Sequence, residues 1–146
     1  IRNTVRSVRS ILSDFSNVLT ISNSSTILSA LNEYNGEVFA LRSQPQREGE
    51  IFCKMLKDKD VSCKIIEDRQ FRRYYDSNTV FLCGCDGYDD NYFINKKGTS
   101  PITGFASQNH RDAFILCGEA KYTNDLRLFT MPPDFELIAR KDITII

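Results

Sequence analysis

The sequence predicts an α/β fold with a Rossmann-like, mainly parallel sheet and helices on both faces. Five short apolar runs of strand length recur along the chain, at residues 17–21, 37–41, 61–66, 79–83 and 113–117. Segments with apolar residues at helical spacing separate most of these runs, and this alternation is typical of a parallel sheet covered by helices. No glycine-rich dinucleotide fingerprint is present, so the fold class does not indicate NAD.

The composition excludes several classes of function. The chain has 146 residues, and its 19 basic and 19 acidic residues cancel, with no basic patch typical of nucleic-acid binding. No apolar run reaches the length of about 18 residues that a membrane-spanning helix needs. We therefore expect one soluble domain with no direct nucleic-acid or membrane partner.

The cysteines favour a reducing compartment. There are five, an odd number, and most fall within apolar strand or helix patterns. The chain has no C-x-x-C, and its single histidine, His110, has no partner at metal-ligand spacing. These features predict reduced thiols, a cytoplasmic location and no metal site.

The first half of the chain carries two polar loops that follow predicted strands. Residues 1–15 have apolar side chains at helical spacing and predict a helix ahead of the first strand. Between that strand and a helix at 26–34 stand Ser22, Asn23, Ser24 and Ser25, where hydroxyls and backbone N–H groups suit an anion. One of them as N-cap, with solvated neighbours, is the simpler alternative.

The second strand leads into Ser43-Gln44-Pro45 and then Gly49, before a helix that includes Ile51, Met55 and Leu56. Gln44 is a candidate binding residue, although an ordinary loop with Pro45 near the helix start explains it equally well. The third strand follows, and Asp68 then begins a short helix that reaches residue 75.

The stretch at 79–99 organises the rest. A buried strand ends at Gly84, Asp86 follows, and a turn with a short return strand at 92–94 leads to Asn95-Lys96-Lys97-Gly98-Thr99. Ligands of open α/β sheets bind at the carboxyl ends of the strands, where this carboxylate, amide and ammonium fall. An aspartate in a turn followed by a helix cap is the simpler alternative.

The last third completes the predicted sheet. A helix at 100–110 precedes the fifth strand, and Lys121 then adds a second cation at the carboxyl edge, unless it is a solvated loop lysine. The chain ends in Thr144-Ile145-Ile146. We expect this apolar end to be buried against a partner chain.

The G-x-D, turn, N-K-x-G-T arrangement resembles one family. That family contains the alpha, beta and delta subunits of translation initiation factor 2B, together with methylthioribose-1-phosphate and ribose-1,5-bisphosphate isomerases. The loops T-I-S-N-S-S, S-Q-P…G and E-A-K-Y are similar to its further motifs, so the resemblance spans residues 17–122. Two positions depart from the isomerases, because Ser22 stands where they have a catalytic cysteine and Gln44 where they have an arginine.

The resemblance implies a phosphorylated sugar or nucleotide as ligand, no cofactor, and pairing with a second copy or a related subunit. It also implies a Rossmann-like domain at 17–146, with residues 1–16 as the connecting helix from a helical domain outside this chain. Asp86 is the acid–base residue if the protein is an active aldose–ketose isomerase. The departures at Ser22 and Gln44 favour a non-catalytic regulatory or assembly protein instead. The implied ligand-binding residues are Ser22, Asn23, Ser24, Ser25, Gln44, Asn95, Lys96, Gly98, Thr99 and Lys121.

Overall fold

The computed structural model describes residues 2–21, 24–43, 47–117, 121–128, 130–141 and 143–146. Its elements begin with a helix, after which strands and helices alternate except where β4, β5 and β6, and later β8 and β9, follow one another directly. They are α1 (Arg2–Leu12), β1 (Asn17–Thr20), α2 (Ser25–Ala30), β2 (Glu37–Leu41), α3 (Glu48–Asp58), β3 (Cys63–Ile66), the 3-10 helix η1 (Asp68–Tyr74), β4 (Thr79–Gly84), β5 (Gly87–Tyr88), β6 (Tyr92–Lys96), α4 (Thr99–Asn109), β7 (Asp112–Leu116), the 3-10 helix η3 (Leu126–Leu128), β8 (Phe135–Ala139) and β9 (Thr144–Ile145).

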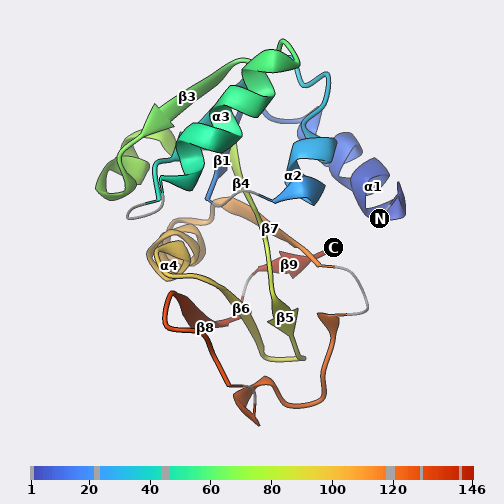
Figure 1. Cartoon of the computed structure of the whole chain (residues 1–146), viewed down its shortest axis with the longest axis vertical. Coiled ribbons are helices and arrows are strands. Elements are labelled where there is room, and N and C mark those ends of the chain that lie inside the picture. The colour runs from blue at the N-terminus through green and yellow to red at the C-terminus, as the bar shows by residue number, and fades with distance from the viewer. Residues whose placement is uncertain (1, 22–23, 44–46, 118–120, 129, 142) are drawn as a thin grey trace.

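The main sheet has six strands in the order β3-β2-β1-β4-β7-β9, and every neighbouring pair is parallel. All five predicted strands are in this sheet, so the predicted α/β, mainly parallel architecture is confirmed (Figure 1). β4 lies between β1 and β7 and is buried along all of its six residues. This double-sided burial explains why its sequence is a continuous apolar run rather than an alternating one.

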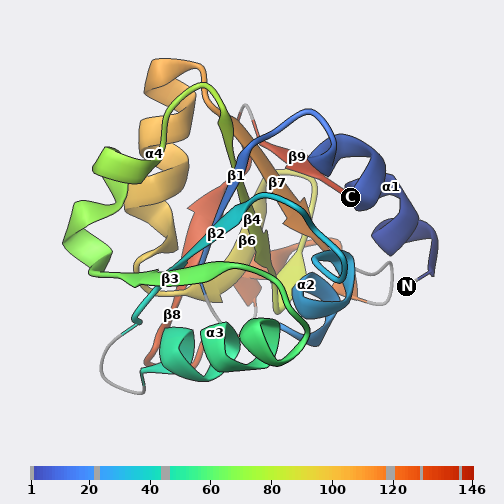
Figure 2. The same ribbon diagram turned by 90° about the horizontal axis from the view of Figure 1, so that it is seen from above.

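Helices cover both faces of the main sheet, as predicted (Figure 2). One hydrophobic core contains Phe81 and Cys83 of β4 together with side chains of η1 and α4. The other contains Val80 and Leu82 together with side chains of α1, α2 and α3. Alternate residues of the same strand therefore point into different cores, as the two-residue period of a strand requires.

A second, smaller sheet follows the carboxyl end of β4. It is antiparallel, with the order β5-β6-β8, and lies below the main sheet in Figure 1. β6 is the predicted return strand, but its pairing with β8 was not predicted. The two strands pair over their full length, although they lie about 40 residues apart in the sequence. The return strand is therefore central in this sheet.

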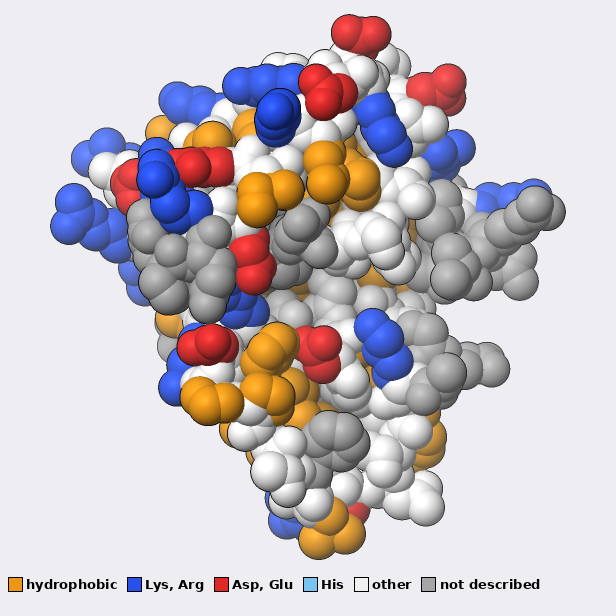
Figure 3. Space-filling model, in the orientation of Figure 1, with side chains coloured by type: hydrophobic (Ala, Val, Ile, Leu, Met, Phe, Trp, Pro, Cys, Tyr) orange, Lys and Arg blue, Asp and Glu red, His pale blue; other side chains and the backbone are white. Residues whose placement is uncertain are grey.

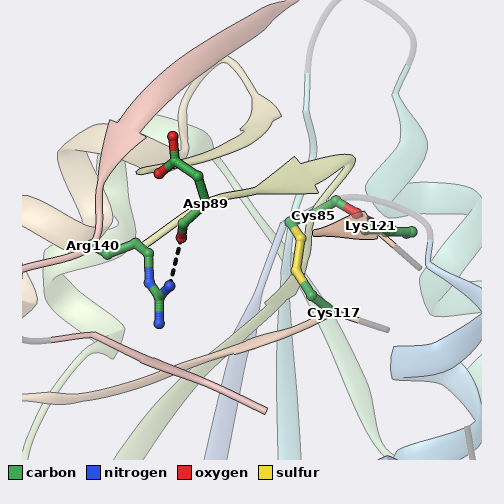
Figure 4. Close-up of a disulfide and its surroundings, with 5 residues drawn as sticks. All are labelled: Cys85, Asp89, Cys117, Lys121 and Arg140. Carbon is green, nitrogen blue, oxygen red and sulfur yellow. Dashed lines mark hydrogen bonds between the residues drawn. A yellow bond between two sulfur atoms is a disulfide. The ribbon is translucent and has the colours of Figure 1, made fainter. Parts of the chain in front are cut away.

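Asp89 holds the hairpin between β5 and β6 in place. The residue is only 3% exposed, and its carboxylate accepts backbone N–H groups of Asn91, Tyr92 and Leu126 at 2.6–2.8 Å. Arg140 donates to the backbone carbonyl of Asp89 at 2.6 Å (Figure 4). Burial acts to raise the pKa of this carboxyl, but the three N–H donors together outweigh it and hold the pKa below its ordinary value.

The chain end pairs with its own main sheet, which the sequence did not predict. Ile145 and Ile146 are only half-buried at this sheet edge, and burial against a partner stays a prediction. β9 pairs with β7 in parallel, and Ile146 exchanges backbone hydrogen bonds with Ile115 and Cys117 at 2.8 and 2.9 Å. The apolar end is thus the sixth strand of the main sheet. The part of the chain that the structure describes contains no helix long and apolar enough to cross a membrane.

The expectation of reduced thiols is wrong for four of the five cysteines. Disulfides join Cys53 of α3 to Cys63 of β3, and Cys85 to Cys117 beyond the ends of β4 and β7. The Cα atoms of the two pairs are 5.4 and 5.8 Å apart, within the usual range for a disulfide. Cys83 is the remaining thiol, and burial raises its pKa. The disulfides remove the support that reduced cysteines gave to a cytoplasmic location.

Replacing Asp89 with Asn should lower the free energy of unfolding by about 1–3 kcal/mol. In the wild type both carboxylate oxygens accept backbone N–H groups, and the amide nitrogen of Asn in place of one oxygen would leave a buried donor without an acceptor. The folded pKa of Asp89 lies below its unfolded value, so its contribution is present above pH ~4 and is lost as the pH falls through the folded pKa. Urea unfolding at pH 7 and pH 3 measures both effects. A variant as stable as the wild type at pH 7 would contradict this role.

Candidate functional site

A cleft of about 470 Å³ lies at the carboxyl edge of the main sheet, where the smaller sheet meets it. Six predicted site residues line this cleft: Ser24, Ser25, Asp86, Asn95, Lys96 and Lys121. Gly84, which the sequence marks as the end of the strand, also lines the cleft. The sequence did not single out the remaining lining residues, which are Thr26, Glu48, Cys85 and Phe135. The predicted residues Ser22, Asn23 and Gln44 lie outside the described residues.

Ser24 is the N-cap of α2. Its Oγ accepts the backbone N–H of Ile27 at 3.4 Å, so the simpler alternative for this loop holds for Ser24. Gly84 lets the loop approach the strand end, because a Cβ there would lie 3.3 Å from Ser24 Oγ. The wall of the cleft on this side is therefore formed by small side chains.

Asp86 follows β4 and has an exposed side chain at the cleft. Its backbone N–H donates to the carbonyl of Ile94 at 2.8 Å, which ties the residue to β6. Partial removal from water raises the pKa of Asp86 above its ordinary value, and the nearby charge of Lys121 opposes that rise. A carboxyl with a raised pKa in a cleft is suited to proton exchange.

Lys121 is hydrogen-bonded to Cys85, the residue that follows β4. Its ammonium donates to the carbonyl oxygen of Cys85 at 2.7 Å, and Cys85 is joined to Cys117 by the disulfide (Figure 4). Lys121 and Asp86 are thus both anchored beside the same sulfur bridge. The disulfide adds a covalent link between the residues that follow β4 and β7, beside these two charges.

Lys96 is the buried cation of the cleft. Its side chain is only 9% exposed, and its ammonium lies 3.2 Å from a carboxylate oxygen of Glu48 at the start of α3. It also donates to the carbonyl of Ser43 at 3.4 Å. The lysine that the sequence predicted to hold phosphate therefore already has an anionic partner within the chain.

A second carboxylate occupies the start of α4. Glu136 of β8 accepts the backbone N–H groups of Gly98 and Ser100 at 3.0 and 3.2 Å. Thr99 is fully buried, and its hydroxyl donates to the carbonyl of Lys96 at 2.7 Å while accepting from the amide of Asn95 at 3.1 Å. The structure thus places Gly98 and Thr99 behind the cleft, where they support Asn95 and Lys96 rather than line it.

Neither carboxylate could be identified as a partner from the sequence. Glu48 is 48 positions from Lys96, and Glu136 is 38 positions from Gly98. Among the described lining residues, the acids Glu48 and Asp86 balance the bases Lys96 and Lys121. Figure 3, in the orientation of Figure 1, shows both acidic and basic side chains across the middle of the molecular surface. The described residues contain no group of three or more His, Cys, Asp or Glu side chains that could hold a metal ion.

Comparison with known proteins decides the family. The model of the initiation factor 2 subunit family matches residues 2–132, which is most of the chain. The chain belongs to the initiation factor 2 subunit family. The resemblance read from the sequence is thereby confirmed. The ribose 1,5-bisphosphate isomerase of Archaeoglobus fulgidus is 30% identical over 118 residues, which cover 77% of this chain and 37% of that protein.

Solved structures of both branches of the family share the fold. Translation initiation factor eIF-2B from Pyrococcus horikoshii OT3 superposes with a TM-score of 0.85 at 20% identity, over 99% of this chain and 61% of its own. The 5-methylthioribose 1-phosphate isomerase of the same organism gives 0.80 at 14% identity, over 98% and 52%. This chain therefore spans about half the length of these family members and less of the curated relative.

Replacing Cys85 and Cys117 together with Ser should lower the free energy of unfolding by about 2–4 kcal/mol, because the bridge closes a loop between residues 32 apart. Urea unfolding without reductant measures the loss, and excess dithiothreitol should give the wild type a larger one, because it also opens the bridge between Cys53 and Cys63. Thiol titration of denatured, unreduced protein should find one reactive thiol among the five cysteines. Five reactive thiols would contradict the pairing.

Proposed function

We propose that this chain is a non-catalytic regulatory or assembly member of the initiation factor 2 subunit family. Its cleft binds a phosphorylated sugar or nucleotide at the carboxyl edge of the sheet. The family contains translation initiation factors and sugar-phosphate isomerases alike, so the choice between them depends on the chemistry of the cleft.

The state of the acid–base groups in the cleft supports a binding role. Conversion of an aldose to a ketose moves protons on adjacent carbons and on their oxygens, which needs positioned groups that exchange protons. Glu48 is paired with Lys96, and the sulfur of Cys85 is bonded to Cys117. The ammonium of Lys121 donates to a backbone carbonyl. Because Glu48 is paired, Asp86 is the available carboxyl among the described lining residues.

The sequence departures support the same choice. Ser22 offers a hydroxyl where the isomerases have a thiol, and a hydroxyl is a far poorer acid near neutral pH. Gln44 offers a neutral amide in place of an arginine, whose fork holds phosphate through two charged hydrogen bonds. Binding survives such changes better than turnover does, since phosphate contacts act on ground and transition states alike.

An active isomerase is the second candidate, and Asp86 favours it. The raised pKa of this carboxyl is suited to proton exchange with a sugar. The relative from Archaeoglobus fulgidus is named as a ribose 1,5-bisphosphate isomerase. In this alternative Asp86 exchanges protons with an aldose 1-phosphate.

The proposal extends to assembly. We propose that α1 connects this domain to a helical domain of a longer protein, and that the chain pairs with a second copy or a related subunit. A family member from C. thermophilum was solved as a tetrameric eIF2B-beta2-delta2 complex. Exposed Ile51 and Met55, one turn apart on α3, are apolar side chains that such a partner would cover. Sedimentation of the full-length protein as a monomer at tens of micromolar would contradict assembly with itself.

The deciding experiment is a coupled isomerase assay with ribose 1,5-bisphosphate and methylthioribose 1-phosphate on the full-length protein. We expect binding by calorimetry without turnover, and a Ser22→Cys variant with nearly unaltered affinity. Removing Lys96 should weaken binding by about 1.5–3 kcal/mol, which is typical of a charge-assisted hydrogen bond. Turnover that disappears in Asp86→Asn would establish the isomerase instead.

A further inference from the structure

We propose that Glu48 is the residue that sets the anion affinity and the charge selectivity of the cleft. Its carboxylate lies against the ammonium of Lys96, so a phosphate that binds this lysine competes with it. The inference rests on the proposed function, in which the cleft binds a phosphorylated ligand. It adds a competing group that the chain itself supplies.

The geometry makes Glu48 a displaceable partner. The 3.2 Å between its carboxylate and the ammonium of Lys96 exceeds the length of about 2.7–2.9 Å that strong charge-assisted hydrogen bonds adopt. The side chain of Glu48 is 32% exposed, whereas that of Lys96 is 9% exposed. Glu48 can therefore turn toward solvent, while the ammonium stays at the wall of the cleft.

The positions of Glu48 and Lys96 determine which charges a ligand phosphate meets in the cleft. Lys96 ends β6 of the smaller sheet, and Glu48 begins α3, which covers the main sheet. Both line the same cleft with Asp86 and Lys121. A ligand phosphate near Lys96 therefore meets repulsion from Glu48 and Asp86 together with attraction from the two lysines.

Charge selectivity follows from this balance. The four charged side chains among the described lining residues sum to zero, and neutralising Glu48 would change that sum to +1. Unit charges about 5 Å apart near a protein surface interact by a few kcal/mol, and solvent exposure reduces this. Removing the negative charge should therefore favour a ligand with two phosphates more than a ligand with one.

The test compares three variants by calorimetry with inorganic phosphate, ribose 5-phosphate and ribose 1,5-bisphosphate as probes. Glu48→Gln should bind ribose 5-phosphate about tenfold or more tightly than the wild type, with a larger gain for the bisphosphate. Glu48→Asp keeps the charge but withdraws it by one methylene group, and should give a smaller gain. Thermal unfolding of each variant confirms that it is folded.

Glu50→Gln is the matched control. It makes the same change of charge on the same helix, two positions away, but Glu50 pairs with Arg42 and Arg47 and does not line the cleft. Its affinity for the probes should stay within about twofold of the wild type, because screening weakens charges outside the cleft. An equal gain in Glu48→Gln and Glu50→Gln would show a general charge effect and overturn the inference.

The outcomes separate this inference from the proposed function. Binding by the wild type with no gain in Glu48→Gln or Glu48→Asp overturns the role of Glu48 and leaves the proposed function standing. Binding by Glu48→Gln alone supports the role of Glu48 and contradicts phosphate binding by the natural chain. Binding by none of the proteins overturns both.

Discussion

The buried ammonium of Lys96 is the constraint on which the cleft depends. An ion removed from water costs several kcal/mol unless partners compensate it, so this lysine can be buried only where the fold supplies a carboxylate and a carbonyl. Glu48 and the carbonyl of Ser43 meet that need. Gly49 brings them close, because a Cβ at this position would lie 2.0 Å from the carbonyl oxygen of Leu41. The start of α3 is thereby pressed against the end of β2.

The same ion pair joins the two sheets of the domain. Lys96 belongs to the smaller sheet, and Glu48 to a helix over the main sheet. Glu136 makes a second connection from β8 to the start of α4, and the disulfide between Cys85 and Cys117 ties the ends of β4 and β7. These three links surround one cleft. Asn95, Lys96 and Lys121 are consequently held by contacts within the chain, which would reduce the ordering cost of the proposed binding.

The sequence predicted the parts of this structure that local pattern encodes. β4 and its neighbours were recognisable because buried strands are short apolar runs, and their carboxyl ends had to share one edge of a parallel sheet. This placed Asp86, Asn95 and Lys96 in one cleft in advance. The observed helix limits differ from the predicted ones by a few residues; for example, α2 ends at Ala30, before its predicted end.

Long-range partners could not be predicted in the same way. Nothing near Lys96 in the sequence marks Glu48, and nothing near Gly98 marks Glu136, because both partners are brought in by tertiary packing. The cysteines were misjudged for the same reason, as pairing depends on the distance between Cα atoms and not on local pattern. The pairing of the apolar chain end with β7 was not predicted, because the open sheet edge that it completes was not visible in the sequence.

The most direct test of this account is the coupling between Lys96 and Glu48 in the unliganded protein. A double-mutant cycle with Lys96→Met, Glu48→Gln and the double variant, read by urea unfolding, isolates their interaction from ligand binding. We expect a coupling free energy of about 1 kcal/mol or more, with Glu48→Gln costing stability only while Lys96 is present. Additive effects of the two substitutions would contradict the claim that this ion pair holds the cleft together.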